Sequence, residues 1–211
     1  IWRYKYISHK NFVFLLSILI GLLAGIVSVI IKNITYGIEW FLETITFSQS
    51  SFYFIFPIIG LWLVYLFVKH ISKQPIEHAI PTILFSLSKK NGLLKRSKIY
   101  LPLITAPITV GFGGSVGLLG PAIASASAIS SNIGQLFHID RKTRTLLIGC
   151  ASAGAIASIF KSPIAAIIFA IEVFSLDLTF ASLLPLLIAS VSSVLTSYFF
   201  LGDEVLFNFT V

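Results

Sequence analysis

Charged side chains are scarce in this chain. Lysine, arginine, aspartate and glutamate make up 11% of its 211 residues, whereas hydrophobic residues make up 56%. The mean hydropathy is +0.96. Soluble globular domains carry about 25% charged residues. The shortage of charge excludes an ordinary soluble domain and, with the hydropathy, predicts an integral membrane protein.

Cysteine is almost absent, and methionine is absent altogether. A single cysteine, Cys150, excludes an intrachain disulfide and a thiolate metal cluster. Because Cys150 lies among small residues in GCASAGA, we expect it to be a packing residue. The sequence begins with Ile1 and contains no methionine, so we expect it to be part of a longer protein.

Long runs without any charge occur three times. Each has about eighteen residues or more, and a helix that rises about 1.5 Å per residue crosses a hydrocarbon core about 30 Å thick over that length. The first run also exceeds the apolar core of a signal peptide, roughly 7–15 residues. We therefore predict membrane-spanning helices over Phe12–Ile31, Ser51–Val68 and Leu178–Gly202.

Positive charge is in excess, with a formal net charge of +7, but it is unevenly distributed. Basic residues gather before the first predicted span and between residues 69 and 98, whereas Lys32, Glu39 and Glu43 nearly cancel between the first two spans. This is the positive-inside pattern of membrane proteins and argues against a nucleic-acid partner. We predict a multi-pass protein of the lipid bilayer of the plasma (inner) membrane, with a cytoplasmic N-terminus.

Proline and glycine interrupt the remaining apolar stretches. The uncharged segment 99–137 contains Pro102, Pro107, Pro121 and a glycine tract at residues 111–120, so we expect it to form two helices, not one. A similar break occurs at residues 161–163. Ten residues of helix span about 15 Å, half of a bilayer, which predicts a re-entrant helix over 81–90. The other helices are predicted over 99–112, 121–137, 145–160 and 163–174.

Each predicted break ends at a helix that starts with proline, at Pro81, Pro121 or Pro163. Irregular backbone within a bilayer is tolerated only when it is buried in protein or lines a water-filled cavity. A helix start there exposes unpaired N–H groups and the positive end of the helix dipole, which attract an anion without a full charge. The glycines would let the ion approach the backbone. Alternatively, Gly111 and Gly113 only allow helices to pack closely.

Three motifs resemble those of the CLC chloride channel and antiporter family. GGSVGLLGP at 113–121 is similar to the family's GGSVG-x-E-G-P, EHAIP at 77–81 falls where the family has G-S-G-I-P, and residues 149–174 look like its pair of small-residue helices. The resemblance implies an all-α integral membrane fold, a bundle of spanning and broken or re-entrant helices made of two inverted halves. Residues 1–211 would form the N-terminal half of the membrane domain, and the full-length protein would be a homodimer with an anion pore in each subunit.

The resemblance also implies which residues surround the anion. Chloride or a similar small anion would be the transported ligand, with no cofactor and no metal. The family's G-x-F-x-P motif and pore tyrosine are absent, so we expect this chain alone not to complete a pathway. The implied anion-binding positions are His78, Ala79, Ile80, Pro81, Gly117, Leu118, Leu119, Gly120 and Pro121.

Two glutamates of the family are replaced in this sequence. Leu119 stands at the position of the gating glutamate, and Val173 stands at the position of the internal proton-site glutamate. In the family the gating carboxylate competes with the anion and carries a proton, and leucine can do neither. Because coupled exchange needs a titratable group, we predict passive, channel-like passage of anions. The alternative is proton-coupled chloride exchange through other groups.

His78 stands where the family has an ion-contacting serine. Its N–H could donate to an anion, and protonation would add a positive charge that increases flux on acidification; alternatively, it only bonds locally at a helix start. An intramembrane enzyme would have to use Ser115, His78 or Glu172, and without an HExxH motif or paired aspartates we do not expect an enzyme. A structural or assembly subunit is the remaining alternative.

Overall fold

All regular secondary structure in the described part of the chain is helical. The computed structural model describes residues 9–45, 55–72, 78–176 and 179–202. In chain order the helices are α2 (His9–Ile45), α3 (Phe56–Phe67), the π-helix η2 (Val68–Ser72), α4 (Ala79–Lys89), α5 (Ser97–Gly111), α6 (Leu119–Leu136), α7 (Arg141–Phe160), α8 (Pro163–Phe174) and α9 (Phe180–Leu201).

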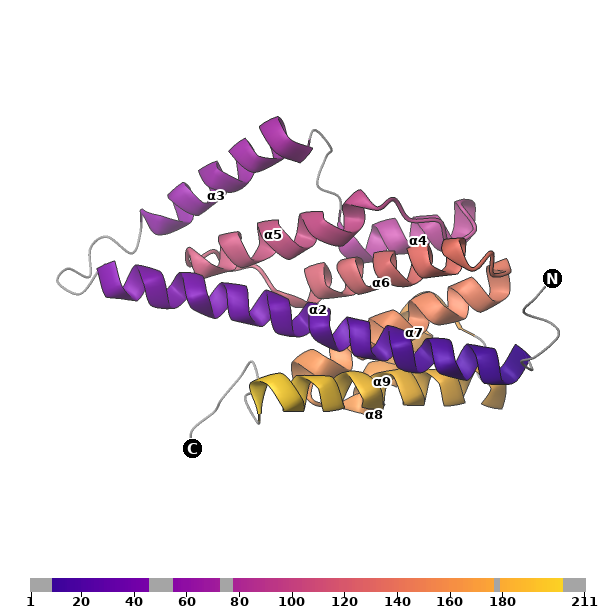
Figure 1. The fold of residues 1–211 in the computed structure, drawn as a ribbon. Helices are drawn as coiled ribbons and strands as arrows, with labels where there is room; N and C mark the ends of the chain where they lie inside the picture. Colours follow the sequence, from indigo (N-terminus) through magenta and orange to yellow (C-terminus); the bar gives the residue numbers. More distant parts are fainter. Residues whose placement is uncertain (1–8, 46–54, 73–77, 177–178, 203–211) are drawn as a thin grey trace.

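Helices α2, α7 and α9 form the centre of the bundle. Figure 1 shows α2 running the length of the molecule with α9 alongside it, and both helices begin at the same end. Helix α7 contacts both of them, α5 and α6 pack on α2, and α4 packs on α6. Helix α3 stands apart from this body and packs on α5 (Figure 1).

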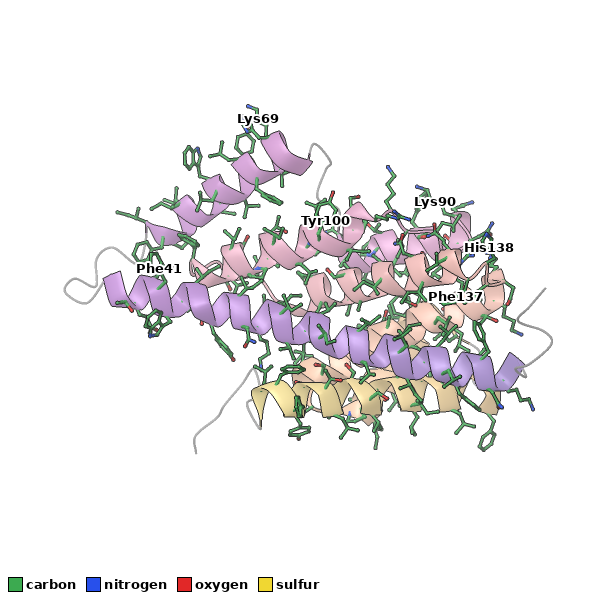
Figure 2. All side chains as sticks on the ribbon, in the orientation of Figure 1. Phe41, Lys69, Lys90, Tyr100, Phe137 and His138 are labelled. Carbon is green, nitrogen blue, oxygen red and sulfur yellow. The ribbon has the colours of Figure 1, made fainter. Side chains whose placement is uncertain are left out.

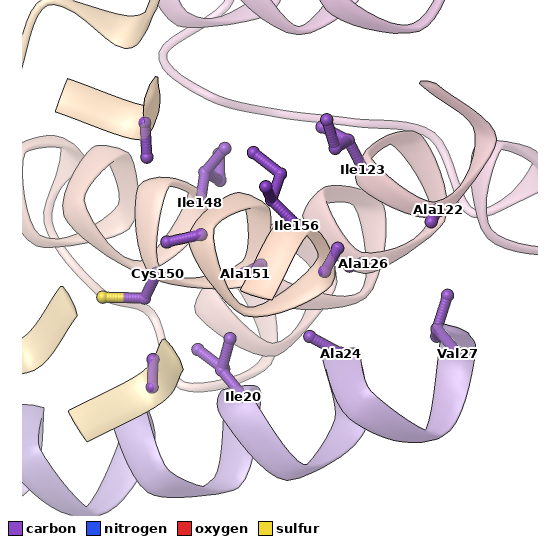
Figure 3. Close-up of a cluster of buried hydrophobic side chains, with 14 of the residues drawn as sticks. Ile20, Ala24, Val27, Ala122, Ile123, Ala126, Ile148, Cys150, Ala151 and Ile156 are labelled. Carbon is purple, nitrogen blue, oxygen red and sulfur yellow. The ribbon is translucent and has the colours of Figure 1, made fainter. Parts of the chain in front are cut away.

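The core consists largely of small and branched apolar side chains. Figure 3 shows Ile20 and Ala24 of α2 gathered with Ala126 of α6 and Ala151 of α7, all of them buried. Cys150 is a free cysteine that is fully buried in the same cluster, as expected for a packing residue. Dispersion contacts in a close-packed interior therefore hold these helices together.

Small residues bring α2, α7 and α9 into backbone contact. Gly21 lies directly against the backbone of Ala189, and a Cβ on Gly25 would come within 2.7 Å of the Thr196 Cβ. Across α7 and α9, the Ser193 hydroxyl donates a hydrogen bond of 2.7 Å to the Gly154 carbonyl. Close approach through small residues and interhelical hydroxyl bonds is how membrane helices associate without a hydrophobic driving force.

The predicted spans are partly confirmed. Helices α2 and α9 are long and apolar enough to cross a membrane, as predicted for the first and third runs. The second helix begins at Phe56, after the predicted start at Ser51, and continues through α3 and the π-helix η2 to Ser72, so it is shorter than the 18 residues required of a candidate span. Residues 51–54 lie outside the described residues. A third helix of sufficient length was missed, α7, whose alanine, serine and glycine residues lower its hydropathy.

Lys32 does not end the first span. Helix α2 has 37 residues and is about 55 Å long, and Lys32 lies within it with 1% of its side chain exposed. Its ammonium group is 5.9 Å from the centre of the Tyr36 ring. The predicted first span, Phe12–Ile31, therefore ends too early, because a lysine stem can pack inside a bundle while its charge is stabilised locally.

The predicted break in the segment 99–137 is confirmed. Residues 112–118 are non-helical and separate α5 from α6. Pro102 and Pro107, however, lie inside α5 and do not end it. Neighbouring helices stabilise membrane helices that contain proline, so the glycine tract alone supplies the break.

We predict that Gly21→Ala destabilises the protein whereas Gly37→Ala does not. The new Cβ at residue 21 would overlap the Ala189 backbone, but a Cβ at residue 37 of the same helix meets nothing within 4 Å. Overpacking typically costs about 1–3 kcal/mol, and alanine at an open helical site gains up to about 1 kcal/mol. Thermal unfolding of the full-length protein in detergent measures both. Equal melting temperatures for the two variants would contradict the packing described above.

Candidate functional site

Helix α4 begins without a side-chain cap. Its N-cap residue, His78, has extended backbone (φ −62°, ψ 132°), and the His78 side chain makes no capping hydrogen bond. The Thr82 N–H donates a hydrogen bond of 3.1 Å to the His78 carbonyl, which closes that turn. The N–H groups of Ala79 and Ile80 precede the first intrahelical bond and so have no partner within the helix. Glu77 lies outside the described residues.

Helix α6 begins in the same uncapped way. Leu118 is its N-cap residue, no side chain caps the first turn, and the Ala122 N–H donates a hydrogen bond of 3.1 Å to the Leu118 carbonyl. The N–H groups of Leu119 and Gly120 have no partner within the helix. Both helix starts therefore present backbone donors and the positive end of a dipole.

The predicted positions of the prolines need correction. Pro81 and Pro121 are each the third residue of their helix, so α4 and α6 begin two residues earlier than predicted. None of the first three helical positions uses its N–H within the helix, and proline therefore fits at the third position as well as the first. Only α8 begins with its proline, Pro163, as predicted.

The starts of α4 and α6 line a single cavity of about 330 Å³. A Cβ on Gly120 would lie 3.6 Å from the Ala79 Cβ, which shows how closely the two helix starts approach each other. The cavity brings together five of the nine predicted anion-binding residues: His78, Ala79, Gly117, Gly120 and Pro121. The start of α8 is not part of its lining.

The other predicted residues lie outside the cavity lining, which does not include Ile80, Pro81, Leu118 or Leu119. Leu118 is buried in the core, and Leu119 is half-buried and packs against the same core. Val173 also packs against the core, on α8, which contacts α7 and α9. Among the described residues, the lining contains no carboxylate.

Helix α5 forms a wall of the cavity that the sequence analysis missed. Its lining residues are Lys98, Leu101, Pro102 and Thr105, a spacing of three, four and seven residues that defines one helical face. Among the lining residues that the structure describes, Lys98 is the one lysine, arginine, aspartate or glutamate. One feature of the sequence could have predicted this face: Lys98 is followed two helical turns later by Thr105, in a segment that is otherwise uncharged.

The glycine tract has a definite backbone role. After α5, the Gly114 N–H donates to the Thr109 carbonyl at 2.8 Å and the Gly113 N–H donates to the Val110 carbonyl at 2.7 Å. Gly113 has φ +85°, which side-chain-bearing residues rarely adopt. These bonds form a Schellman motif that ends α5 and directs the loop towards the start of α6.

Neither a hydrolase nucleophile nor a metal site is evident in the described residues. GGSVG at 113–117 matches the pattern G-x-S-x-G, but that motif acts at a strand-to-helix turn, whereas here Ser115 lies exposed in a loop between two helices. The described residues contain no group of three or more histidine, cysteine, aspartate or glutamate side chains that could hold a metal ion. The chemistry of this site is therefore that of backbone dipoles, one lysine and one histidine.

Comparison with known proteins identifies the family. The family profile described as voltage gated chloride channel matches residues 59–211, well over half of the chain. The chain belongs to the CLC family. The predicted resemblance is thus confirmed, and the CLC relatives are ion channels and transporters of the membrane.

Individual relatives agree with this assignment. An uncharacterised protein of Methanocaldococcus jannaschii is 29% identical over 208 residues, 98% of this chain and 49% of that protein. The chloride/fluoride channel protein of Pseudomonas syringae pv. tomato is 22% identical over 82% of this chain and 37% of its own length. The chain therefore spans about half the length or less of these curated relatives.

Solved structures confirm the CLC-like helical fold. The crystal structure of a CLC-type fluoride/proton antiporter superposes with a TM-score of 0.73 and 29% identity, over 92% of this chain and 48% of that chain. A slow cyanobacterial Cl−/H+ antiporter superposes with a TM-score of 0.76 and 17% identity, over 97% of this chain and 51% of that chain.

We predict that His78→Asp stabilises the start of α4 and removes anion binding there. An aspartate at this N-cap can accept a bond from the Ile80 N–H, worth about 0.5–2 kcal/mol, while its charge repels an anion. Wild-type protein should gain thermal stability as chloride is added, because a ligand of the folded state stabilises it. The Asp variant should lose that dependence.

The matched control is His78→Asn, which caps the helix without a charge and should keep the chloride dependence. Chloride-dependent melting of the full-length Asp variant equal to that of wild type would contradict an anion site at this helix start.

Proposed function

We propose that this chain supplies part of a pathway by which chloride or similar small anions cross the membrane. The observation that carries the proposal is the convergence of two helix starts without N-cap side-chain bonds, α4 and α6, on one cavity whose described lining residues include no carboxylate. Two helix dipoles and unpaired N–H groups would attract an anion there. The side chain of Lys98 adds positive charge to the same lining.

Such a site suits passage better than storage of an ion. Each helix end carries the equivalent of about half an elementary charge, so the attraction is weaker than that of a ring of arginines. Conduction requires binding that is favourable enough to admit an ion and weak enough to release it. Gly117 and Gly120 would let the anion approach the backbone closely.

We propose that the passage is passive. The position expected for a gating carboxylate holds Leu119, whose side chain packs against the core. The position expected for the internal proton site holds Val173, which also packs against the core. Neither side chain binds a proton, so neither could couple proton movement to anion movement.

The alternative is proton-coupled exchange through another group. It is favoured by the two solved structures, which are a fluoride/proton and a Cl−/H+ antiporter. His78 lines the cavity, and its imidazole is a group that can bind and release a proton. A pH gradient that drives anions uphill in liposomes would favour this alternative over passive passage.

The full-length protein would provide the rest of the pathway. We propose that residues 1–211 form the N-terminal half of a CLC-type membrane domain, and that a second half closes the cavity. The CLC resemblance further suggests a homodimer with one pathway in each subunit. The proposed activity is transport, without enzymatic chemistry and without a cofactor besides the transported anion.

Leu119→Glu should introduce proton dependence. The carboxylate would compete with the anion at the start of α6 above its ordinary pKa of about 4.3 and would release the site when protonated. Chloride flux in liposomes should therefore be about tenfold lower near neutral pH than at a pH below 4.3. Leu119→Gln, which has the same shape and no charge, should show no such dependence; identical pH profiles for the two variants would refute the assignment of residue 119.

His78 should make wild-type flux rise on acidification, because protonation of its imidazole would add a positive charge beside the cavity. His78→Gln should flatten that profile. The control is His70→Gln, since His70 is exposed and bonds to the Leu66 carbonyl away from this cavity. A profile that stays steep in His78→Gln would mean that another group carries the pH dependence.

A further inference from the structure

A second cavity lies where the three long apolar helices begin. Its volume is about 910 Å³, and its lining comes from the first turns of α2, α7 and α9 and from the end of α8. Figure 1 shows α2 and α9 beginning at this end of the molecule. Ends of membrane-spanning helices lie near the lipid headgroups, so this cavity opens at the level of the interface.

One part of the cavity is basic. Lys10, Arg141 and Lys142 all line it, and none of its described lining residues is a carboxylate. Hydroxyl groups of Thr143, Thr145, Ser175, Thr179 and Ser182 complete the described polar lining. The Arg141 guanidinium also donates a hydrogen bond of 3.3 Å to the Leu87 carbonyl, which fixes its position between α7 and α4.

The helix starts at this cavity are already capped. Asp140 accepts a hydrogen bond of 3.1 Å from the Thr143 N–H at the start of α7. Thr179 and Ser182 form a reciprocal capping box at the start of α9. The attraction for an anion therefore comes from lysine and arginine side chains, unlike that of the first cavity.

The other part of the cavity is apolar. Phe14 of α2, Leu146 of α7, Leu176 after α8 and Leu184 of α9 line it. Phe180, one turn before Leu184, is 83% exposed, and Leu184 is 46% exposed. A ligand that satisfied the whole surface would need an anionic group at one end and a hydrocarbon chain at the other.

We infer that this groove binds one anionic phospholipid of the leaflet that meets this end of the protein. The phosphate lies against Lys10, Arg141 and Lys142, and an acyl chain lies along Phe180 and Leu184. Basic pockets between membrane helices bind acidic lipid headgroups by the same combination of charge and burial. The volume is at the upper end of the roughly 300–1,000 Å³ typical of ligand sites, which accommodates part of a phospholipid.

Lipid binding to the full-length protein tests this inference. Delipidated protein in detergent is titrated with dioleoylphosphatidylglycerol, and bound lipid is counted by native mass spectrometry. We expect one saturable phosphatidylglycerol per subunit and much weaker binding of dioleoylphosphatidylcholine. Glycerol phosphate, the headgroup without its chains, should not displace the lipid.

Two variants test the two parts of the groove separately. Lys10→Gln combined with Lys142→Gln should weaken phosphatidylglycerol binding by roughly tenfold to thirtyfold. Ala181→Trp should weaken it while leaving the charge unchanged, because Ala181 lines the groove and the indole would fill the apolar part. The matched control is Lys89→Gln combined with Lys90→Gln, which removes the same charge outside the groove lining and should retain wild-type binding. Equal melting temperatures establish that each variant is folded.

Several results would overturn the inference. Equal losses in the Lys10/Lys142 and Lys89/Lys90 variants would mean diffuse surface attraction. Unchanged binding in Ala181→Trp, or displacement by glycerol phosphate, would mean a site for a soluble anion. The absence of any saturable lipid in the wild-type protein would mean that another segment of the full-length chain, or a second copy, fills the groove.

Discussion

A helix that begins inside a membrane bundle has N–H groups that need a partner, and this requirement shapes the whole chain. Water is scarce there, and an unsatisfied peptide group costs several kcal/mol. The chain meets the requirement in two ways. At the N-terminal starts of α7 and α9, side chains cap the helix: Asp140 caps α7, and the Thr179–Ser182 pair caps α9. At α4 and α6 the N-cap residue makes no such bond, and both starts line a shared cavity. The uncapped starts are the ones that a permeating anion could satisfy.

The rest of the fold holds those two helix starts in place. Helices α2, α7 and α9 pack through small residues such as Gly21 and Gly154, and the Ser193 hydroxyl bonds across to α7. That rigid core supports α6, which contacts α7, and α6 in turn supports the short helix α4. The left-handed backbone at Gly113 then reverses the chain after α5, so that α5 becomes a wall of the same cavity.

Figure 2 shows lysine and histidine side chains, such as Lys90 and His138, at the end away from Phe41.

The sequence predicted the local breaks better than the long-range arrangement. The end of α4, at Lys89 against a predicted end at residue 90, and the break at residues 112–118 were predictable. Left-handed backbone falls on Asn91, Gly92 and Gly113, where the sequence has asparagine and glycine. Hydropathy did not predict α7 as a span, because the small residues that pack in the core lower its value. It also ended the first span before Lys32, which is buried within α2. Proline marked the helix starts only to within two residues, since several first-turn positions accept it. The wall formed by α5 depends on tertiary packing, and no local rule places Lys98 beside His78.

The replacement of a carboxylate by leucine changes which groups control the proposed site. A glutamate at residue 119 would compete with the anion for the same N–H groups, and its protonation would set the occupancy. Leu119 packs against the core instead and leaves the donors to the ion. In this proposal, control by pH falls to the imidazole of His78, and the Lys98 side chain adds positive charge to the same lining. Because a histidine gains positive charge on acidification, whereas a carboxylate loses negative charge, both would favour the anion at low pH. The two groups differ in the pH at which their charge changes. The pH range over which flux changes, and not the direction of the change, therefore identifies the group that controls it.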